Sequence, residues 1–443
     1  MLSPYGRTSR NSLNLEIEMA TGNRPSVVII GAGFGGLWAA RAFAGASVDV
    51  LVLDKNNYHA FLPLLYQVAA AELEPEDIIY PIRSILRKYP NIRFQLSEVI
   101  AIDPAQRKIQ TRNQSIAYDY LILSVGSKAH YFGVTGAAEH AFPLKTLDDA
   151  VLLRNHILCR FEGATIETDA KIRQKMLTFT IVGGGPTGVE FAGALAELVR
   201  NPLVRDYPGL DMSQVRILLV EATNRLLTGL PERLHTYALK RFQRMGVDVQ
   251  LNSTVSQITS QAVVLKDGRE IPTETVVWTA GVGGISLPQN WAFPTRPNGQ
   301  VEVLPTLQLP NHPEIYIIGD LAHVEQDGHQ LLLIAPVATQ EGKWAARNIM
   351  RQIGGLEPQP FRYRDPGMMV TTGRNAAVVQ IGKQAFTGFP GWVIWVSVHL
   401  FRLIGFRNRL MVLINWAWDY IFFDRVVRLI LPLPVTEPLG KDC

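Results

Sequence analysis

The stretch SVVIIGAGFGG, residues 26–36, constrains the fold of this chain more than any other segment. Its apolar, mostly β-branched residues lead directly into the turn GAGFGG, which predicts a buried strand and then a helix over residues 37–43. In this pattern Gly31 permits the tight turn, Gly33 lets a pyrophosphate approach the backbone, and Gly36 lets the helix pack on the strand. The free N–H groups at the start of the helix then face the phosphates.

The strand that follows this helix ends in an acid. Residues 48–53 predict the strand, and Asp54 lies roughly 20 residues after Gly31, where a carboxylate that binds a ribose is expected. Strand, glycine-rich turn, helix and acid in this order predict a dinucleotide site. A tight strand–helix turn that binds nothing is the alternative.

The same arrangement recurs far downstream. Residues 179–182 are apolar and lead into GGGPTG, residues 183–188, and a strand predicted over residues 215–220 ends at Glu221. A carboxylate here accepts hydrogen bonds from a ribose 2′-hydroxyl and repels a 2′-phosphate, which favours NADH over NADPH. Arg225 follows closely and could weaken this preference. Two such fingerprints predict two bound dinucleotides.

Other predicted strands end in glycine, which lets the backbone approach a ligand closely. These strands cover residues 118–123 before Gly126, residues 276–279 before Gly281, and residues 314–318 before Gly319 and Asp320. The Asp320 carboxylate could bind a ribityl hydroxyl of a flavin, and an N-cap for the next segment is the alternative. A helix is predicted to begin within residues 335–342.

Composition narrows the classes of protein to which this chain could belong. A chain of 443 residues, 47% of them hydrophobic, predicts two or three domains with large cores. The formal charge of +4 is only mildly basic and does not by itself indicate a nucleic-acid partner. Cys159 and Cys443 are too few for a disulfide framework or a cysteine-rich metal site, and the histidines form no ligand cluster, so we expect no metal. Residues 1–24 lack the apolar core of a secretory signal and predict a disordered tail.

The C-terminal part of the chain differs in character. Residues 392–401 and 410–418 are apolar, but neither run reaches the roughly 20 residues that a membrane-spanning helix needs. Half of the eight tryptophans lie here among arginines: Trp392, Trp395, Trp416 and Trp418. Tryptophan and arginine on short apolar helices are typical of the headgroup region of a membrane and also of a dimer interface. We expect both.

Several blocks together resemble a known family. GAGFGG, GGGPTGVE, IGDLA and APVATQEG, with DKNNYHAFLPLLYQVA and VHLFRLIGFRNRLMVLINWAWDY, are similar to the two-dinucleotide flavoproteins and specifically to the type II NADH:quinone oxidoreductases. The similarity covers residues 26–431. It implies an enzyme that passes a hydride from NADH to FAD and two electrons on to a membrane quinone, without pumping protons.

The motifs and the resemblance together assign the site residues. The FAD site comprises Gly31, Gly33, Phe34, Gly35, Gly36, Asp54, Lys55, Gly126, Gly319, Asp320 and Ala338. The NADH site comprises Gly183, Gly185, Pro186, Thr187, Gly188, Glu221 and Gly281. Many relatives read AQxAxQ where this chain has Ala335 and Pro336, so the role of their first glutamine is not carried over.

Glu190 and Gln340 are the two candidate catalytic residues. We expect Glu190 in the first turn of its helix, where the dipole favours a carboxylate, either as a structural acid or near the flavin as a proton donor. Gln340 could donate a hydrogen bond to a quinone carbonyl without burying a charge. A surface glutamine that touches nothing is the alternative.

The implied architecture is an α/β fold with two Rossmann-like domains. We predict an FAD domain of residues 25–145 and 295–385, interrupted by an NADH domain of residues 146–294. Amphipathic helices over residues 386–443 would bind a membrane and form a homodimer. The expected location is the cytoplasmic, or equivalent NADH-containing, face of a respiratory membrane, with quinone and lipid but no nucleic acid as partners.

Three rival functions follow from the same motifs. A sulfide:quinone oxidoreductase works through active-site cysteines, and the position of Cys159 in a predicted helix away from every motif disfavours it. An NADPH-preferring quinone reductase of quinone biosynthesis would differ in coenzyme preference. A redox sensor or nucleic-acid-binding flavoprotein would need a long basic patch, whereas the arginines here stand among tryptophans and leucines.

Overall fold

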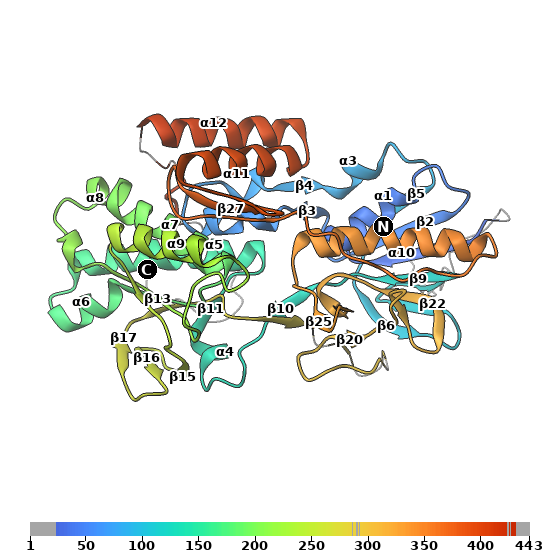
Figure 1. The fold of residues 1–443 in the computed structure, drawn as a ribbon, viewed down its shortest axis with the longest axis horizontal. Coiled ribbons are helices and arrows are strands. Elements are labelled where there is room, and N and C mark those ends of the chain that lie inside the picture. The colour runs from blue at the N-terminus through green and yellow to red at the C-terminus, as the bar shows by residue number, and fades with distance from the viewer. Residues whose placement is uncertain are drawn as a thin grey trace, which may run out of the picture. The chain divides into compact units, whose positions relative to one another are not determined.

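The computed structural model describes residues 24–285, 287–288, 291, 293–422, 425 and 427–430. The predicted N-terminal tail therefore lies, apart from Arg24, outside the described residues, as do residues 431–443 of the predicted C-terminal segment. The chain divides into two compact units, whose elements are labelled in Figure 1. Unit 1 comprises the chain up to Asn57 with residues 82–126 and 284–363, and unit 2 comprises residues 58–81, 127–283 and 364 onward.

Unit 1 is built on a six-stranded sheet in the order β21-β22-β9-β1-β2-β5. These strands are β1 (Ser26–Ile30), β2 (Asp49–Asp54), β5 (Ile92–Leu96), β9 (Tyr120–Leu123), β21 (Gln308–Leu309) and β22 (His312–Ile317). All pairs are parallel except β21 with β22. Every residue of β1 is buried, as expected for a central parallel strand covered on both faces.

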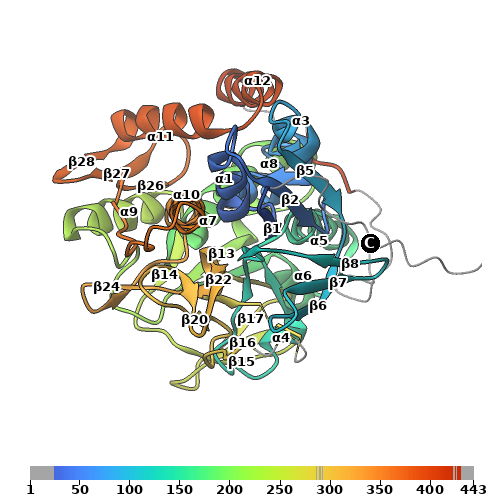
Figure 2. The ribbon, with the colours of Figure 1, turned by 90° about the vertical axis from the view of Figure 1, so that its right-hand side faces the viewer.

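Two helices cover this sheet beside the first glycine-rich turn. α1 (Phe34–Ala42) packs on β1 and β2, and α10 (Ala335–Ile353) packs against α1, as Figure 2 shows. Unit 1 also contains α3 (Ile82–Leu86), an antiparallel sheet of β6 (Val99–Asp103), β7 (Lys108–Thr111) and β8 (Ser115–Ala117), and the short turn η5 (Gly319–Leu321). Minor pairs join β20 (Val301–Glu302) to β23 (Ala322–His323) and β24 (Glu325–Gln326) to β25 (His329–Gln330).

Unit 2 repeats the design. Its parallel sheet has the order β11-β18-β12-β13-β14. The strands are β11 (Ala141–Pro143), β12 (Thr178–Val182), β13 (Arg216–Val220), β14 (Val247–Gln250) and β18 (Thr275–Trp278). The accompanying helices are α4 (Ala137–His140), α5 (Leu147–Ile166), α6 (Ala170–Met176), α7 (Pro186–Arg200), α8 (Pro202–Asp206) and α9 (Glu232–Arg244). The order of strands around β1 and around β12 is that of a Rossmann half, so the predicted α/β class is confirmed.

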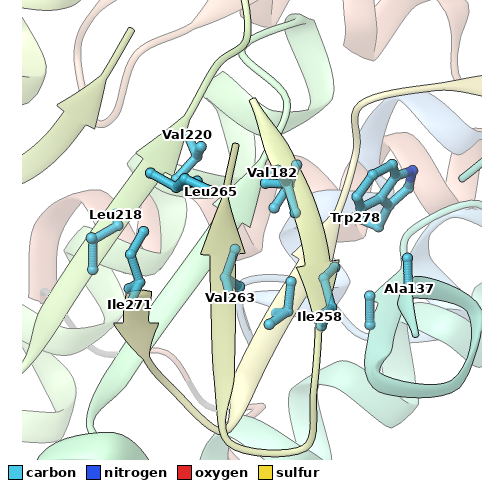
Figure 3. Close-up of a cluster of buried hydrophobic side chains, with 12 residues drawn as sticks. Ala137, Val182, Leu218, Val220, Ile258, Val263, Leu265, Ile271 and Trp278 are labelled. Carbon is cyan, nitrogen blue, oxygen red and sulfur yellow. The ribbon is translucent and has the colours of Figure 1, made fainter. Parts of the chain in front are cut away.

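A small antiparallel sheet packs against the parallel sheet of unit 2 (Figure 3). Its strands are β15 (Val255–Ile258), β16 (Ala262–Leu265) and β17 (Glu270–Pro272). Val182, Leu218 and Trp278 from the large sheet pack with Val263 and Ile271 from the small one. Each fully buried aliphatic side chain of this kind stabilises the fold by about 1.5–3 kcal/mol. This core fixes the strands whose ends carry the second glycine-rich turn.

The C-terminal elements belong to unit 2. They are β26 (Met368–Thr371), β27 (Ala377–Ile381), β28 (Gln384–Thr387), α11 (Gly388–Arg402) and α12 (Phe406–Phe422), and they accompany β3 (Tyr58–Ala60), α2 (Leu65–Ala69) and β4 (Ile79–Pro81). The Nδ2 group of Asn408 holds α12 in place by donating to three carbonyl oxygens, of Glu76, Asp77 and Ile79. Of the helices that the structure describes, none has both the length and the apolar character needed to cross a bilayer.

Two expectations differ from the structure here. Residues 58–81, 127–145 and 364–385, which we placed in the FAD domain, lie in unit 2, because α2 packs on α5 and α7 and because β26 packs on α7. Trp395 and Trp416, expected at a membrane surface, are only 1% and 9% exposed. They face the interior of unit 2, so of the four tryptophans only Trp392 and Trp418 remain at least partly exposed.

Candidate functional site

The first glycine-rich turn has the backbone geometry that only glycine permits. Gly31 has φ = +96°, and a Cβ there would lie 2.2 Å from the carbonyl oxygen of Ser124. A Cβ at Gly36 would lie 1.8 Å from the Gly31 carbonyl oxygen, so α1 can pack this closely only with glycine at that position. At Gly33, by contrast, no atom lies within 4 Å of the Cβ position, which leaves space beside the backbone.

The second glycine-rich turn lies in unit 2, and its glycines repeat the geometry of the matching glycines of the first turn. Gly183 has φ = +114°, a Cβ at Gly188 would lie 1.9 Å from the Gly183 carbonyl oxygen, and the space beside Gly185 is open. Neither α1 nor α7 has a side-chain N-cap or an acid in its first turn. A helix start without a side-chain cap or a nearby acid suits an anionic ligand such as a phosphate.

Each turn is tied to an acid at the end of the neighbouring strand. Asp54 Oδ2 accepts a 2.6 Å hydrogen bond from the N–H of Ala32, and Glu221 Oε2 accepts one of 2.6 Å from the N–H of Gly184. Burial raises the pKa of Asp54 from its ordinary value, while hydrogen bonds and the exposed Lys55 lower it. A carboxylate beside an open turn and a helix start that no side chain caps fits a dinucleotide in each unit.

The remaining predicted residues of the two turns lie at their edges. Phe34 is half-buried at the first position of α1, Gly35 is buried behind it, and Pro186 and Thr187 are exposed in the first turn of α7. Gly126 follows β9 with φ = +79° and open space around it. At Gly281, the tip of the Phe132 ring would lie 2.3 Å from a Cβ.

Sequence reasoning missed two hydroxyl residues beneath the turns. Ser124, at the end of β9, donates its N–H to the Ile30 carbonyl and lies close to Gly31 and Gly35. Thr279, at the end of β18, donates its hydroxyl to the carbonyl oxygens of Val182 and Gly183. The signal that could have revealed them is a small hydroxyl residue ending the next parallel strand in both units.

Gly319 and Asp320 follow β22 and face α10 in unit 1. Gly319 has φ = +70°, and its N–H donates to Glu341 Oε2 at 2.6 Å. A Cβ at Gly319 would lie 3.5 Å from the Ala338 side chain, so α10 passes close to this turn. Asp320 lies inside η5, whose N-cap position is Ile318, so the N-cap alternative for Asp320 is wrong.

Glu341 is a third residue that sequence reasoning missed. Its side chain is buried, with 1% of the residue exposed, and burial raises its pKa to about 8. Gln340, one residue earlier, is half-buried in the second turn of α10. A buried acid in an early turn of a helix, after a Gly-Asp strand end, is the signal that could have indicated Glu341.

Glu190 does not lie in the first turn of its helix, where we expected it. α7 begins at Pro186 and has no acid in its first turn, so Glu190 starts the second turn and the dipole argument does not apply. The residue is 9% exposed, and its Oε1 accepts a 3.3 Å hydrogen bond from the N–H of Thr371. Burial raises the pKa of Glu190 to about 8. Burial therefore favours the protonated form of this carboxyl group. Glu190 belongs to unit 2 and Gln340 to unit 1.

No metal centre forms within the described part of the chain, where no group of three or more His, Cys, Asp or Glu side chains could hold an ion. Cys159 lies buried in α5, and Cys443 is outside the described residues.

Known proteins share this sequence and fold. The pyridine nucleotide-disulphide oxidoreductase family matches residues 25–342. The type II NADH:quinone oxidoreductase of Mycobacterium tuberculosis is 37% identical over 413 residues, which cover 90% of this chain and 88% of that protein. A mitochondrial internal alternative NAD(P)H-ubiquinone oxidoreductase of Arabidopsis thaliana is 30% identical over 445 residues, covering 92% and 86%. The structure of NDH2 from Plasmodium falciparum in complex with NADH has a TM-score of 0.83 and 18% identity, covering 92% of this chain and 100% of that one, and so shows the same fold.

Proposed function

The chain belongs to the pyridine nucleotide-disulphide oxidoreductases and, within them, to the type II NADH:quinone oxidoreductases, and from this premise we propose which of its residues serve that reaction. It is an FAD-dependent NADH:quinone oxidoreductase. When bound, FAD accepts a hydride from NADH and supplies two electrons to a quinone. One observation carries the proposal: both units contain the same glycine-rich turn, and in each unit a backbone N–H of the turn donates a hydrogen bond to an acid, Asp54 or Glu221.

Unit 1 holds FAD in this proposal. The open space at Gly33 and the uncapped start of α1 accept the pyrophosphate, and Asp54 accepts hydrogen bonds from the ribose. Gly319, whose N–H donates to Glu341, and the neighbouring Asp320 would hold the ribityl chain. The experiment that tests this is release of the cofactor by heat from the purified protein. We expect one FAD per chain, and a protein that neither carries nor takes up FAD would contradict the proposal.

Unit 2 holds NADH. Gly185 and the start of α7 accept its pyrophosphate, and Glu221 accepts hydrogen bonds from the adenosine ribose. Arg225, which could have favoured a 2′-phosphate, forms an ion pair with Glu232 at 3.7 Å. The negative charge of Glu221 therefore favours NADH over NADPH. This preference separates the chain from an NADPH-dependent reductase of quinone biosynthesis.

Glu190 and Gln340 serve the quinone half of the reaction. Glu190 is a buried carboxyl whose raised pKa favours the protonated form, which can pass a proton on. Gln340 offers a neutral amide early in α10, suited to donating a hydrogen bond to a quinone carbonyl. Both roles are proposed from the resemblance to the family, and the structure places Glu190 in unit 2 and Gln340 in unit 1.

The helices α11 and α12 supply the membrane surface of the proposed peripheral enzyme. Phe401 and Phe406 are 78% and 81% exposed, and each is followed by an exposed arginine, Arg402 and Arg407. Aromatic rings beside guanidinium groups suit the lipid headgroup region on the NADH-containing side of the membrane. The same surface could pair two copies as a homodimer.

Substitution of exposed residues tests the membrane surface without opening the core. Phe401→Asp and Phe406→Asp should weaken sedimentation with anionic liposomes and leave the melting temperature unchanged. Ile166→Asp, at an 82% exposed position at the end of α5, is the control and should bind liposomes like the wild type. Wild-type protein without affinity for liposomes would contradict the proposal and leave α11 and α12 as a dimer interface, which sedimentation velocity would show.

A further inference from the structure

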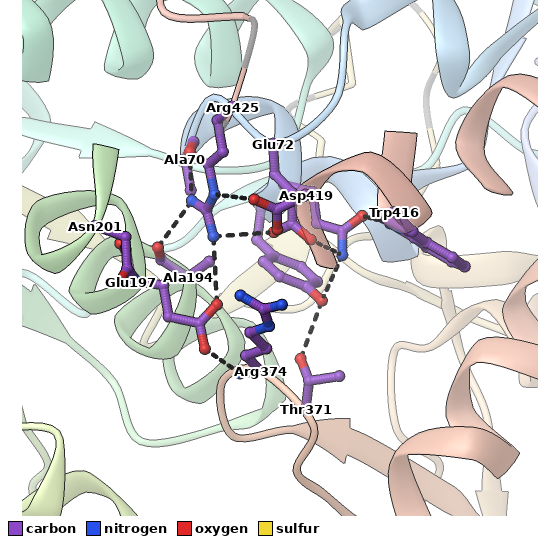
Figure 4. Close-up of polar contacts among 12 residues, drawn as sticks. Ala70, Glu72, Ala194, Glu197, Asn201, Thr371, Arg374, Trp416, Asp419 and Arg425 are labelled. Atoms are coloured by element: carbon purple, nitrogen blue, oxygen red, sulfur yellow. Dashed lines mark hydrogen bonds and ion pairs between the residues drawn. The ribbon is translucent and has the colours of Figure 1, made fainter. Parts of the chain in front are cut away.

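A cluster of charged side chains lies inside unit 2, where the end of α2, α7 and α12 come together (Figure 4). Arg425 is at its centre, with 2% of its side chain exposed. Its Nη1 donates to the carbonyl oxygens of Ala70 and Ala194 at 2.8 and 3.0 Å. The guanidinium group therefore joins the segment after α12 to two other elements.

Three carboxyl groups face this guanidinium group. Arg425 lies 3.6 Å from Glu72, 3.4 Å from Glu197 and 3.9 Å from Asp419, measured between nitrogen and oxygen atoms. Arg374 is the second cation beside them, and its backbone N–H donates to Glu197. Three acids against two cations leave one negative charge in excess, which favours binding of a proton. Burial raises the pKa of Glu72 to about 8, with Arg425 and Arg374 lowering it and Asp419 and Glu197 raising it.

A hydrogen-bonded path leads from Glu72 into the interior. Gln67 Nε2 donates to Glu72 Oε1 at 3.1 Å and to the Tyr66 hydroxyl at 3.2 Å. Trp416 Nε1 donates to Gln67 Oε1 at 3.0 Å, which fixes the orientation of this amide. Because the Tyr66 oxygen accepts from Gln67, its own proton is available to Thr371 Oγ1, 3.0 Å away. The backbone N–H of Thr371 in turn donates to Glu190.

Both ends of this path line one cavity of about 50 Å³. That volume admits water, and the lining of Glu72, Tyr66 and Glu190 offers it several polar partners. The buried indole of Trp395 also lines this cavity. The Glu72 side chain is 14% exposed, whereas Tyr66 and Glu190 are 4% and 9% exposed as whole residues. Of these two acids in the cavity lining, Glu72 is thus the more exposed and Glu190 the more buried.

We propose that Glu72 takes up a proton from solvent and passes it, through water in the cavity beside Tyr66, to Glu190. The proposal rests on the proposed function, in which NADH, one proton and a quinone give NAD⁺ and a quinol. The hydride of NADH carries two electrons and one proton, so solvent must supply the second proton. Glu190 releases its proton toward the quinone and regains one from Glu72. Gln67 does not carry the proton, because its amide only orients the two oxygen atoms it bonds.

Glu72→Gln removes the titrating group at nearly constant shape, and Glu76→Gln, at an exposed position four residues later, is the matched control. Stopped-flow absorbance separates reduction of the flavin by NADH from its reoxidation by a water-soluble quinone. We expect Glu72→Gln to leave the first step unchanged and to slow the second roughly tenfold or more. Imidazolium in the buffer should restore the rate, and Glu72→Asp should keep most of it.

Infrared spectroscopy of the protein without substrates gives a second readout. At neutral pH the spectrum of Glu72→Gln should lack one protonated-carboxyl band that the wild type and Glu76→Gln retain. Reoxidation at the wild-type rate would overturn the proposal, and so would slow reoxidation that imidazolium does not restore, since Glu72 would then only balance Arg425.

If Glu72→Gln fails to fold, Tyr66→Phe carries the same test, because it removes the hydroxyl between the two carboxyls and keeps the ring. Slow reoxidation with normal flavin reduction supports the proposal, and normal rates of both steps overturn it. A wild-type flavin that NADH does not reduce, or that quinone does not reoxidise, would instead contradict the proposed function.

Discussion

The carboxylate of Glu221 accepts a 2.6 Å hydrogen bond from the backbone N–H of Gly184. The acid that we propose to distinguish the two coenzymes is therefore fixed to the turn that we propose to bind their pyrophosphate. Its second oxygen accepts from the N–H of Thr223 at 2.8 Å, so the carboxylate has little freedom to turn away from a ribose. Its negative charge stands at a defined position, and a 2′-phosphate would have to approach it directly.

Replacing this charge should change coenzyme preference. Glu221→Gln keeps the shape and removes the repulsion, so the ratio of kcat/KM for NADPH to that for NADH should rise about tenfold or more, since hydrogen bonds to charged groups are worth about 1.5–3 kcal/mol. Steady-state kinetics with both coenzymes measures the ratio. Glu270→Gln, at an exposed position of β17, should leave it unchanged. A wild type that prefers NADPH would point to the biosynthetic reductase.

Two glycines of the second turn should respond differently to the same substitution. Gly188→Ala places a Cβ 1.9 Å from the Gly183 carbonyl oxygen, so the backbone must shift, and we expect a loss of about 1–3 kcal/mol or more in the free energy of unfolding. Gly185→Ala meets no atom within 4 Å and should keep the wild-type melting temperature. It should raise KM for NADH, because the methyl group enters the space proposed for the pyrophosphate. Equal melting temperatures for both variants would contradict the geometry of this turn.

The buried carboxyl of Glu341 should make stability depend on pH. Burial raises its pKa from 4.5 to about 8, so the folded protein binds this proton more tightly than the unfolded chain does. The free energy of unfolding should therefore fall as pH rises from about 4.5 to about 8, by up to about 1.4 kcal/mol per pH unit for one such group. In thermal melts, Glu341→Gln should lose less stability over this window than the wild type. Glu357→Gln, at an exposed position, is the control and should behave like the wild type. If Glu341→Gln and the wild type gave identical profiles of stability against pH, Glu341 would be ionised in the folded protein.

Gln340→Ala should separate the two half-reactions. Loss of one neutral hydrogen bond to the quinone costs about 0.5–1.5 kcal/mol, which slows quinone reduction a few-fold to tenfold. Reduction of the flavin by NADH and electron transfer to ferricyanide should not change. Gln352→Ala, near the other end of α10, where the side chain bonds Tyr316, is the control for both steps. Equal slowing of both steps would assign Gln340 to support of the flavin site, and unchanged quinone kinetics would remove it from the site.

The sequence predicted those features that depend on neighbours along the chain. Positive φ at Gly31 and close packing at Gly36 follow from glycine spacing after an apolar strand, and the position of Asp54 follows from the length of one strand–helix–strand unit. The second turn was predicted in the same way. These are local requirements of backbone geometry, so the residue types alone express them.

The features that escaped prediction depend on contacts between distant segments. Glu190 meets Thr371, and Arg425 meets Ala70 and Glu72, only after folding, so neither the burial of these acids nor their raised pKa values could be inferred. The apolar run with Trp395 was equally ambiguous, because a short uncharged helix does not reveal which of its faces is buried.

Anaerobic double mixing in a stopped-flow instrument tests the central claim most directly. The purified protein is mixed first with one equivalent of NADH and then with a quinone, and the flavin absorbance is followed throughout. We expect NADH to bleach the absorbance and the quinone to restore it fully. Absorbance that NADH does not bleach, or that the quinone does not restore, would contradict the account.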